Sequence, residues 1–230
     1  MCGRFTLTQT AEQITNAFQL PTAPHVVPRY NIAPTQPVPA VVMAIETGDR
    51  EFRLFYWGLI PSWAKDIKMG ARLINARAET VAEKPSFRTA FKRRRCLIVA
   101  DGFYEWKRSE KGKQPYYFYL GSAEAPEERS PFGFAGLWEH WESSEGDTIE
   151  SCTILTTAAN DLLSPIHDRM PVILHPQDYE VWLDPTLQKP EALQPLLRPF
   201  PTEEMGSHAV SSRMNNARTD DPDCIQPIRA

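Results

Sequence analysis

The chain has 230 residues, of which 42% are hydrophobic, and it carries a formal net charge of −4 at pH 7. A chain of this size can bury a core of its own, so we expect a single domain spanning residues 1–230. Its first twenty residues lack the features of a signal or import sequence, and no apolar stretch reaches the roughly 18 residues of a membrane span; both predict a cytoplasmic protein with no membrane partner.

The first sixty residues predict one helix, one ordered loop and two strands. Thr10 is a suitable N-cap for a helix over residues 9–18, whose apolar residues recur at helical spacing. Residues 21–39 contain six prolines, and we predict an ordered loop there because proline lacks a backbone N–H and restricts its predecessor. Residues 38–46 and 51–60 are rich in β-branched and aromatic side chains, which predicts two strands joined by a turn.

The rest of the chain predicts mostly strands. We expect a helix near residues 78–92 and then, over residues 95–108, a strand, a tight Asp-Gly turn and another strand. Further strands are predicted at residues 114–120, 131–142 and 147–159, and short helices at residues 176–183 and 190–198, while the last twenty residues are polar with few apolar anchors. This pattern predicts an α+β fold: a strongly curved, barrel-like sheet of mixed or antiparallel strands with a few peripheral helices.

Positive charge is concentrated in the middle of the sequence. Residues 65–113 hold 14 Lys or Arg against 6 Asp or Glu, whereas the remainder holds 11 against 23. Because local patches decide electrostatic steering, this region is a candidate anion-binding face despite the negative total. The competing interpretation is that the KRRR run at residues 92–95 is a solvated helix end.

The four cysteines are widely spaced and form no CxxC pair, so the sequence predicts neither a metal site nor a cofactor. Cys96 and Cys152 lie in apolar runs and are predicted to be small buried side chains. Cys2 is different because it stands directly after Met1, and a small residue at position two commonly permits removal of the initiator methionine.

Removal of Met1 would leave Cys2 with a free α-amine beside its thiol, and we expect this terminus to be exposed. An α-amine has a pKa of about 7.7 to 8.0, so a useful fraction is neutral and can condense with an aldehyde. The thiol can then add to the resulting imine and close a thiazolidine ring, which no interior cysteine can do. The competing interpretation is that a cysteine at position two is incidental.

Two further residues could move protons. Glu105 lies among aromatic residues in FYEW, and burial there would raise its pKa and suit it to general acid and base catalysis. Strand alternation would direct it away from Tyr104 and Trp106. His167 stands before a buried-looking strand, where an imidazole can transfer protons near neutral pH. A solvated strand carboxylate is the alternative for Glu105.

Several residues could recognise nucleic acid. Asn75 could orient an amine or a sugar oxygen, and Arg77 could hold a phosphate with its forked donors. Trp63, Trp106 and Phe87 could stack against unpaired bases, each contact contributing roughly 1 to 3 kcal/mol. Each of these side chains could equally be structural.

Eight motifs follow one another in a fixed order along the chain: MCGRF, RYNIAPTQ, WGLIPSWA, INARAET, ADGFYEW, AGLWE, TILTTAAN and HDRMPVIL. Together they resemble the SOS response-associated peptidase family, and the resemblance runs from Cys2 to about Pro227. It implies a sensor and shield of abasic sites in single-stranded DNA, which forms a thiazolidine with the ring-opened sugar. It also implies a lyase side activity and self-removal of Met1.

The resemblance implies roles for individual residues. Cys2 would form the covalent bond, Asn75 would hold its α-amine, Glu105 would assist sugar opening and imine formation, and His167 would be the second proton-transfer group. The positions implied to contact the phosphate backbone or the sugar are Arg4, Arg77, Thr156 and Arg169. We expect a monomer whose partner is single-stranded DNA containing abasic sites.

Two other functions remain open at this point. In a cysteine-type peptidase, Cys2 would attack peptide bonds with His167 as its base. In a non-covalent binder of single-stranded DNA, Arg77 and the tryptophans would hold the strand and Cys2 would be idle. Covalent capture of an abasic oligonucleotide distinguishes the cross-linker from the non-covalent binder, and turnover of unfolded polypeptides identifies the peptidase.

Overall fold

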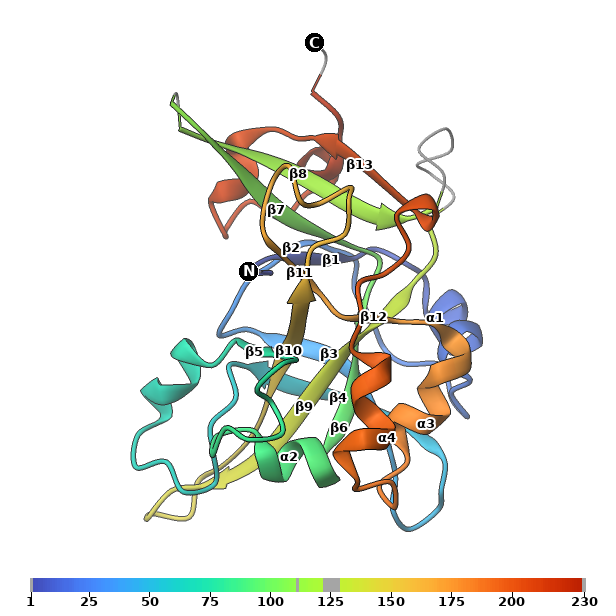
Figure 1. The fold of residues 1–230 in the computed structure, drawn as a ribbon, viewed down its shortest axis with the longest axis vertical. Coiled ribbons are helices and arrows are strands. Elements are labelled where there is room, and N and C mark those ends of the chain that lie inside the picture. Colours follow the sequence, from blue (N-terminus) through green and yellow to red (C-terminus); the bar gives the residue numbers. More distant parts are fainter. Residues whose placement is uncertain (1, 111, 122–128, 229–230) are drawn as a thin grey trace.

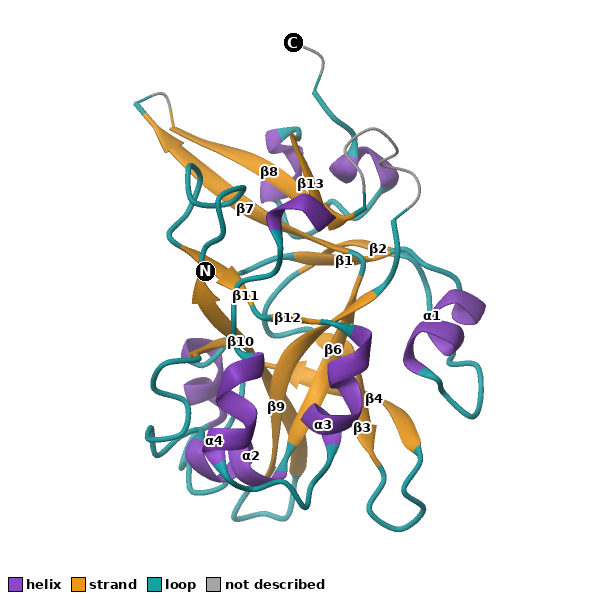
Figure 2. Cartoon of the chain, turned by 45° about the vertical axis from the view of Figure 1, so that its right-hand side comes forward, coloured by secondary structure: helices purple, strands orange, loops and turns teal. Residues whose placement is uncertain are grey.

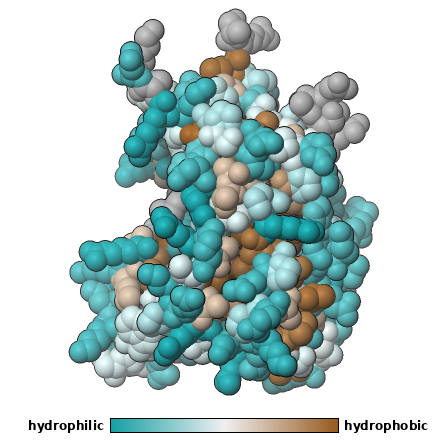
Figure 3. Space-filling model, in the orientation of Figure 1, coloured by the Kyte–Doolittle hydropathy of each residue, from teal (hydrophilic) through white to brown (hydrophobic). Residues whose placement is uncertain are grey.

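A closed β-barrel and a second, open sheet lie one above the other in this computed structural model (Figure 1). The structure describes residues 2–110, 112–121 and 129–228. Met1 and most of the acidic insert at residues 122–130 therefore lie outside the described residues. Figure 3 shows that hydrophilic residues cover most of one face of the molecule, with hydrophobic residues gathered toward its middle.

Five strands close the barrel. In order around it they are β3 (Pro37–Met43), β6 (Arg95–Ala100), β9 (Phe132–Glu142), β10 (Thr148–Ala158) and β4 (Arg50–Trp57), which returns to β3. All neighbours are antiparallel except β10 and β4. Three short strands extend this sheet: β5 (Asn75–Arg77) and β11 (Arg169–Pro171) pair with β10, and β12 (Ile173–Leu174) pairs with β9. The predicted barrel-like α+β fold is thus confirmed.

The second sheet carries the N-terminal strand. Its order is β13 (Met205–Ala209), β8 (Gly112–Leu120), β7 (Gly102–Ser109), β1 (Phe5–Leu7) and β2 (Arg29–Ile32), all antiparallel. The C-terminal residues pack against this sheet, and Cys224 and Ile225 are buried beside Tyr104 and Tyr117. The polar tail predicted to have few apolar anchors is therefore an integral part of the fold.

The helices are short, and those in the lower half of the molecule lie beside the barrel strands (Figure 2). They are α1 (Ala11–Phe18), α2 (Arg88–Arg93), α3 (Tyr179–Leu183) and α4 (Pro190–Leu193), with 3-10 turns η1 (Ile67–Arg72), η2 (Pro176–Asp178), η3 (Gln194–Leu196), η4 (Thr202–Glu204), η5 (Ser212–Asn215) and η6 (Pro222–Ile225). Helix α1 begins at the predicted cap, where Thr10 and Gln13 form a capping box. Among the described residues, no helix is both long and apolar enough to cross a membrane.

Three local predictions were wrong. The helix expected over residues 78–92 is reduced to α2, because Pro85 disfavours helical backbone at the residue before it and the preceding residues form turns. The loop expected over residues 21–39 contains β2 and the start of β3. Pro37 and Pro39 are tolerated there because they pair only with β4, while pairing with β6 begins at Ala40.

The predicted Asp-Gly hairpin turn is also wrong, since β6 belongs to the barrel and β7 to the second sheet. Residues 101–102 carry the chain from one to the other. Gly102 is required at this crossing, because a Cβ atom there would lie 2.0 Å from the hydroxyl oxygen of Tyr117. The crossing sets the position of every later residue of β7, including Glu105.

Asp101 fastens the N-terminal strand to this crossing. Its fully buried carboxylate accepts hydrogen bonds from the hydroxyl groups of Thr6 and Thr8, from the backbone N–H of Thr8 at 2.8 Å and from the amide of Gln9 at 3.3 Å. Buried donors that lose their acceptor retain the full cost of desolvation. Asp101 therefore fixes the segment that follows Cys2.

Replacing Asp101 with alanine is expected to lower the free energy of unfolding by about 2 to 4 kcal/mol, because several buried donors lose their acceptor together. Chemical denaturation monitored by tryptophan fluorescence measures this loss. Asp161→Ala is the control, since Asp161 is exposed and should change stability by less than about 0.5 kcal/mol. Equal stability of the two variants would contradict the anchoring role.

The basic run at residues 92–95 is only partly a solvated helix end. Arg95 is 4% exposed and donates to the backbone oxygens of Trp182 at 2.6 Å and Phe91 at 2.8 Å. Burial lowers its pKa to about 10. Arg94 forms an ion pair with Glu139 at 2.6 Å. These two arginines stabilise the fold, so the predicted anion-binding face has fewer available cations than the sequence suggests.

Candidate active site at the N-terminus

The N-terminus lies at the junction of the barrel and the second sheet, beside β11 (Figures 1 and 2). Strand β1 pairs with β7 through Phe5 and Phe103, and the backbone N–H of Tyr104 donates to the carbonyl oxygen of Arg4 at 3.0 Å. Continuing in this antiparallel direction, the chain before β1 runs toward Glu105. The sheet thus directs Cys2 to the predicted acid and base.

Cys2 is fully buried, although an exposed terminus was expected. Its side chain belongs to the main hydrophobic core, and its sulfur lies 3.9 Å from the carbonyl oxygen of Arg4. Burial raises the pKa of the thiol far above its usual value, and the nearby carboxylate of Glu105 raises it further. This burial opposes formation of the thiolate, the reactive form of a cysteine.

Asn75 contacts the residue it was predicted to serve. Its Nδ2 donates to the carbonyl oxygen of Cys2 at 2.9 Å. Parallel pairing of β5 with β10, in which Asn75 lies opposite Ile154, fixes this position. Its Oδ1 atom is buried and has no hydrogen-bond donor among residues 2–110, 112–121 and 129–228. One end of the amide thus binds Cys2, and the other is open to a donor.

Glu105 is 2% exposed. Burial raises its pKa, and the charge interaction with the imidazole of His167 acts in the opposite direction. The buried side chain faces away from Tyr104, whose hydroxyl donates to Tyr30 O at 2.6 Å within a separate cluster. A carboxyl group in this setting keeps its proton to a higher pH than an exposed one, as general acid catalysis requires.

His167 lies on the loop that precedes β11. Its backbone N–H donates to Leu163 O at 2.9 Å, and its Nδ1 accepts from the backbone N–H of Arg169 at 2.9 Å. In the neutral ring this acceptance assigns the proton to Nε2. The charged ring could instead donate from Nδ1 to Asp168, whose oxygen lies at 3.1 Å. Because Asp168 is largely exposed, that ion pair contributes little.

The predicted phosphate contacts lie close to this loop. Arg169 binds both carboxylate oxygens of Glu79, at 2.7 and 2.9 Å, and also donates to the backbone oxygen of Thr156 at 2.5 Å. Arg169 lowers the pKa of Glu79 by this hydrogen bonding. Thr156 is fully buried beneath Arg169, whereas Arg77 is exposed at the end of β5. Arg77 thus has a more accessible guanidinium group than Arg169.

The other predicted DNA contacts differ in their exposure. Trp63 is 56% exposed on the loop after β4, and Trp106 is partly exposed at the edge of the Tyr104 cluster. Arg4 is half-buried and donates to Asn31 Oδ1 at 2.7 Å. Phe87 is 7% exposed and packs in the main core, so it is not available for base stacking. The Phe87 prediction was wrong because the side chain packs into the main core directly before α2.

A cleft of about 370 Å³ lies next to the predicted site. It is lined by Trp106, Lys107, Arg108 and the loop 165–168 that carries His167. Lys107 and Arg108 fall in the basic stretch 65–113, although no motif singles them out as contacts. Glu79 was not predicted, and its only signal was its place two residues after Arg77 in NARAE. The cleft brings positive charge to the open side of His167.

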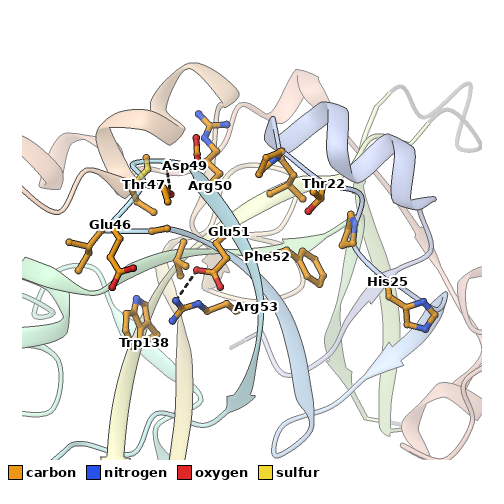
Figure 4. Close-up of a pocket in the computed structure, with 17 residues that line it drawn as sticks. Thr22, His25, Glu46, Thr47, Asp49, Arg50, Glu51, Phe52, Arg53 and Trp138 are labelled. Atoms are coloured by element: carbon orange, nitrogen blue, oxygen red, sulfur yellow. Dashed lines mark hydrogen bonds and ion pairs between the residues drawn. The ribbon is translucent and has the colours of Figure 1, made fainter.

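A larger hollow, of about 750 Å³, lies elsewhere, between the β3–β4 hairpin and the loop after α1 (Figure 4). Glu51 and Arg53 form an ion pair at 2.8 Å there, beside Trp138. None of the predicted site residues lines it. Across the described ranges, no group of three or more His, Cys, Asp or Glu side chains is arranged to hold a metal ion.

Comparison with known proteins places this geometry in a family. The family profile described as SOS response associated peptidase (SRAP) matches residues 1–217. A Bacillus subtilis protein named abasic site processing protein YoqW is 42% identical over 98% of this chain and 99% of its own length. The Pongo abelii abasic site processing protein HMCES is 34% identical over 87% of this chain and 65% of its own length. A crystal structure of a protein from Bacteroides thetaiotaomicron has a TM-score of 0.85 at 27% identity, covering 99% of this chain and 100% of that one. The chain therefore belongs to the SOS response-associated peptidase family.

Proposed function

We propose that this protein processes abasic sites in single-stranded DNA, and that Cys2 forms the covalent bond once Met1 has been removed. The proposal is carried by the grouping of Cys2 with Asn75, Glu105 and His167 at the junction of the two sheets. The relatives named as abasic site processing proteins support the choice of substrate.

The α-amine of Cys2 begins the reaction. Its nitrogen attacks the aldehyde carbon of the ring-opened sugar, and loss of one water gives an imine. The unpartnered Oδ1 of Asn75 is available, among the described residues, to accept a hydrogen bond from this amine and orient its lone pair. Glu105, whose pKa is raised chiefly by burial, supplies the proton that the departing oxygen needs.

The thiol completes the reaction. Its sulfur adds to the carbon of the imine, which still carries a proton on its nitrogen, and a thiazolidine ring closes, so that the whole sequence releases one water. Burial keeps the pKa of the thiol high, which leaves the amine as the first nucleophile. Glu105, having given up its proton, is the base that accepts the thiol proton. Ring closure also competes with β-elimination from the imine, the source of the lyase side activity.

A cysteine peptidase acting on other proteins is less well supported. Such an enzyme needs a thiolate, and the burial that raises the pKa of Cys2 opposes one. Self-removal of Met1 remains part of the proposal, because it requires one hydrolysis at the bond before Cys2 with Glu105 as the neighbouring acid and base. This single hydrolysis uses one water molecule, and its substrate is the chain itself.

The proposed DNA surface combines exposed rings and cations. Trp63 and Trp106 would stack on unpaired bases, while Arg77 and the cations of the 370 Å³ cleft would bind phosphates. Arg4, Thr156 and Arg169 would fix the sugar and phosphate beside the lesion. The protein would act as a monomer, with one copy cross-linked to each abasic site.

The test is a denaturing gel of the protein with a single-stranded oligonucleotide that contains one abasic site. Protein lacking Met1 should give a heat-stable shifted band, and an undamaged oligonucleotide should give none. Acetylating the α-amine should abolish the band although every side chain is intact, because the imine cannot form. Mass spectrometry of the mature protein verifies that Met1 is absent.

The other two functions give different results. A non-covalent binder would show salt-sensitive binding but no band after heating. A peptidase would cleave unfolded polypeptides with repeated turnover, whereas the proposed cross-linker should not. Absence of the heat-stable band with verified mature protein would reject the proposed function.

A further inference from the structure

Arg4, two residues after Cys2, and Trp106, directly after Glu105, both hydrogen-bond to one segment near the C-terminus. We call residues 211–220 the C-terminal loop. Arg4 Nη1 donates to the backbone oxygen of Met214 at 2.9 Å, and Arg4 Nη2 donates to that of Asn215 at 3.1 Å. Trp106 Nε1 donates to Asn215 Oδ1 at 2.7 Å. Arg4 and Trp106, both proposed to contact DNA, are thus held by hydrogen bonds to the same loop.

The C-terminal loop is itself held by β2. Asn31 is fully buried, and its Nδ2 donates to three backbone oxygens of the loop. They belong to Met214 at 2.9 Å, Asn216 at 3.1 Å and Thr219 at 2.7 Å. Asp220 closes the arrangement by accepting from the backbone N–H of Asn31 at 3.1 Å. These buried and repeated contacts give the loop a defined conformation against the sheet.

Asn215 accepts hydrogen bonds from both Arg4 and Trp106. Its side-chain oxygen must face Trp106, because the indole N–H and the Asn Nδ2 are both donors only. Its backbone oxygen binds Arg4 independently of its side chain. Asn215 is exposed and outside the core, so changing its side chain removes the contact to Trp106 without disturbing packing.

We propose that Asn215 is a positioning residue that orients the ring of Trp106 for stacking on an unpaired base. The C-terminal loop would then be part of the DNA-binding site. The inference rests on the proposed function, since it assumes that Trp106 contacts DNA. Fixing the edge of a partly exposed indole leaves its face open and lowers the rotamer entropy that is lost when a base stacks.

A double-mutant cycle tests this role. Asn215→Ala removes the acceptor, and Trp106→Phe keeps an aromatic face but removes the donor. Each single change should weaken binding of an undamaged single-stranded oligonucleotide about threefold to tenfold, measured by fluorescence anisotropy. The double variant should bind no more weakly than the weaker single variant, because both changes break one contact. The first-order cross-linking rate at saturating abasic oligonucleotide should stay within about twofold for Asn215→Ala, as expected from an effect on binding alone.

Asn216→Ala is the matched control. Asn216 is an exposed neighbour in the same loop, and its Oδ1 accepts from the backbone N–H of Arg218 at 3.1 Å rather than from a proposed DNA contact. It should change the affinity by less than about twofold. Without DNA, the indole N–H resonance of Trp106 in a ¹⁵N spectrum should move in Asn215→Ala and stay in place in Asn216→Ala.

The outcomes separate the inference from the function on which it rests. If the wild-type protein binds and cross-links DNA but Asn215→Ala matches it in affinity, the positioning role is rejected and the proposed function stands. Multiplicative losses in the double variant, or an unmoved indole resonance, also reject the role. A wild-type protein that binds no single-stranded DNA rejects both.

Discussion

Replacing Cys2 with alanine is expected to reduce the heat-stable adduct with abasic DNA by more than about 100-fold while leaving non-covalent binding intact. The variant still has an α-amine after loss of Met1, so it can form the imine. It has no sulfur to close the ring, and ring closure gains its speed from holding amine and thiol on one residue. The imine therefore stays reversible and partitions toward β-elimination, so strand cleavage should increase. Denaturing gels that resolve the adduct from the cleaved strand measure both products.

Cys152→Ala is the matched control for this prediction. Cys152 is also fully buried with a raised pKa, but it lies in β10 and has no α-amine beside it. Its adduct yield should match that of the wild type, although its stability falls. An undiminished adduct in Cys2→Ala would show that the thiol does not close a ring. Loss of the adduct together with loss of DNA binding would point to a folding defect instead.

The predictable part of the fold is the part governed by neighbours in sequence. Helix α1 begins directly after its N-cap Thr10, as predicted, because the cap and the apolar period lie within one segment. The change of sheet at Asp101 depends on pairings with β1 and β9, and nothing in the Asp-Gly dipeptide distinguishes it from a hairpin turn. Arg95 likewise looks like part of a charged run until its long-range acceptor in α3 is known.

Motifs predicted the residues of the candidate site, but they did not predict the residues that hold those side chains in place. Asn75 and His167 lie in recognisable motifs, and the fold places Asn75 against Cys2 and His167 in the cleft beside Trp106. Asn31 and Asn215 act across gaps of more than 100 residues in contacts that no local pattern encodes. The burial of Cys2 was missed for a similar reason, because position two in the sequence suggests exposure, whereas the strand that follows carries it into the core.

Glu105→Gln should slow cross-linking by about 100-fold to 10,000-fold, because the amide can neither donate nor accept the proton that imine formation and ring closure require. The same change should stabilise the protein at neutral pH. Burial raises the pKa of Glu105 in the folded state above that of an exposed carboxyl, so the folded protein binds more protons than the unfolded chain between those two pKa values. The contribution of Glu105 to the free energy of unfolding therefore falls as pH rises through that window and stays low above it.

A neutral glutamine does not titrate, so Glu105→Gln should lack this fall and melt at a higher temperature than the wild type at neutral pH. Glu142→Gln is the control, since Glu142 is exposed at the end of β9 and should change neither the rate nor the melting temperature. Thermal melting across the acid range, paired with cross-linking rates, measures both effects. A slower but more stable variant cannot be explained by unfolding, so it would assign the lost rate to the carboxyl group itself. A slower variant with an unchanged pH profile of stability would contradict the raised pKa on which the acid role depends.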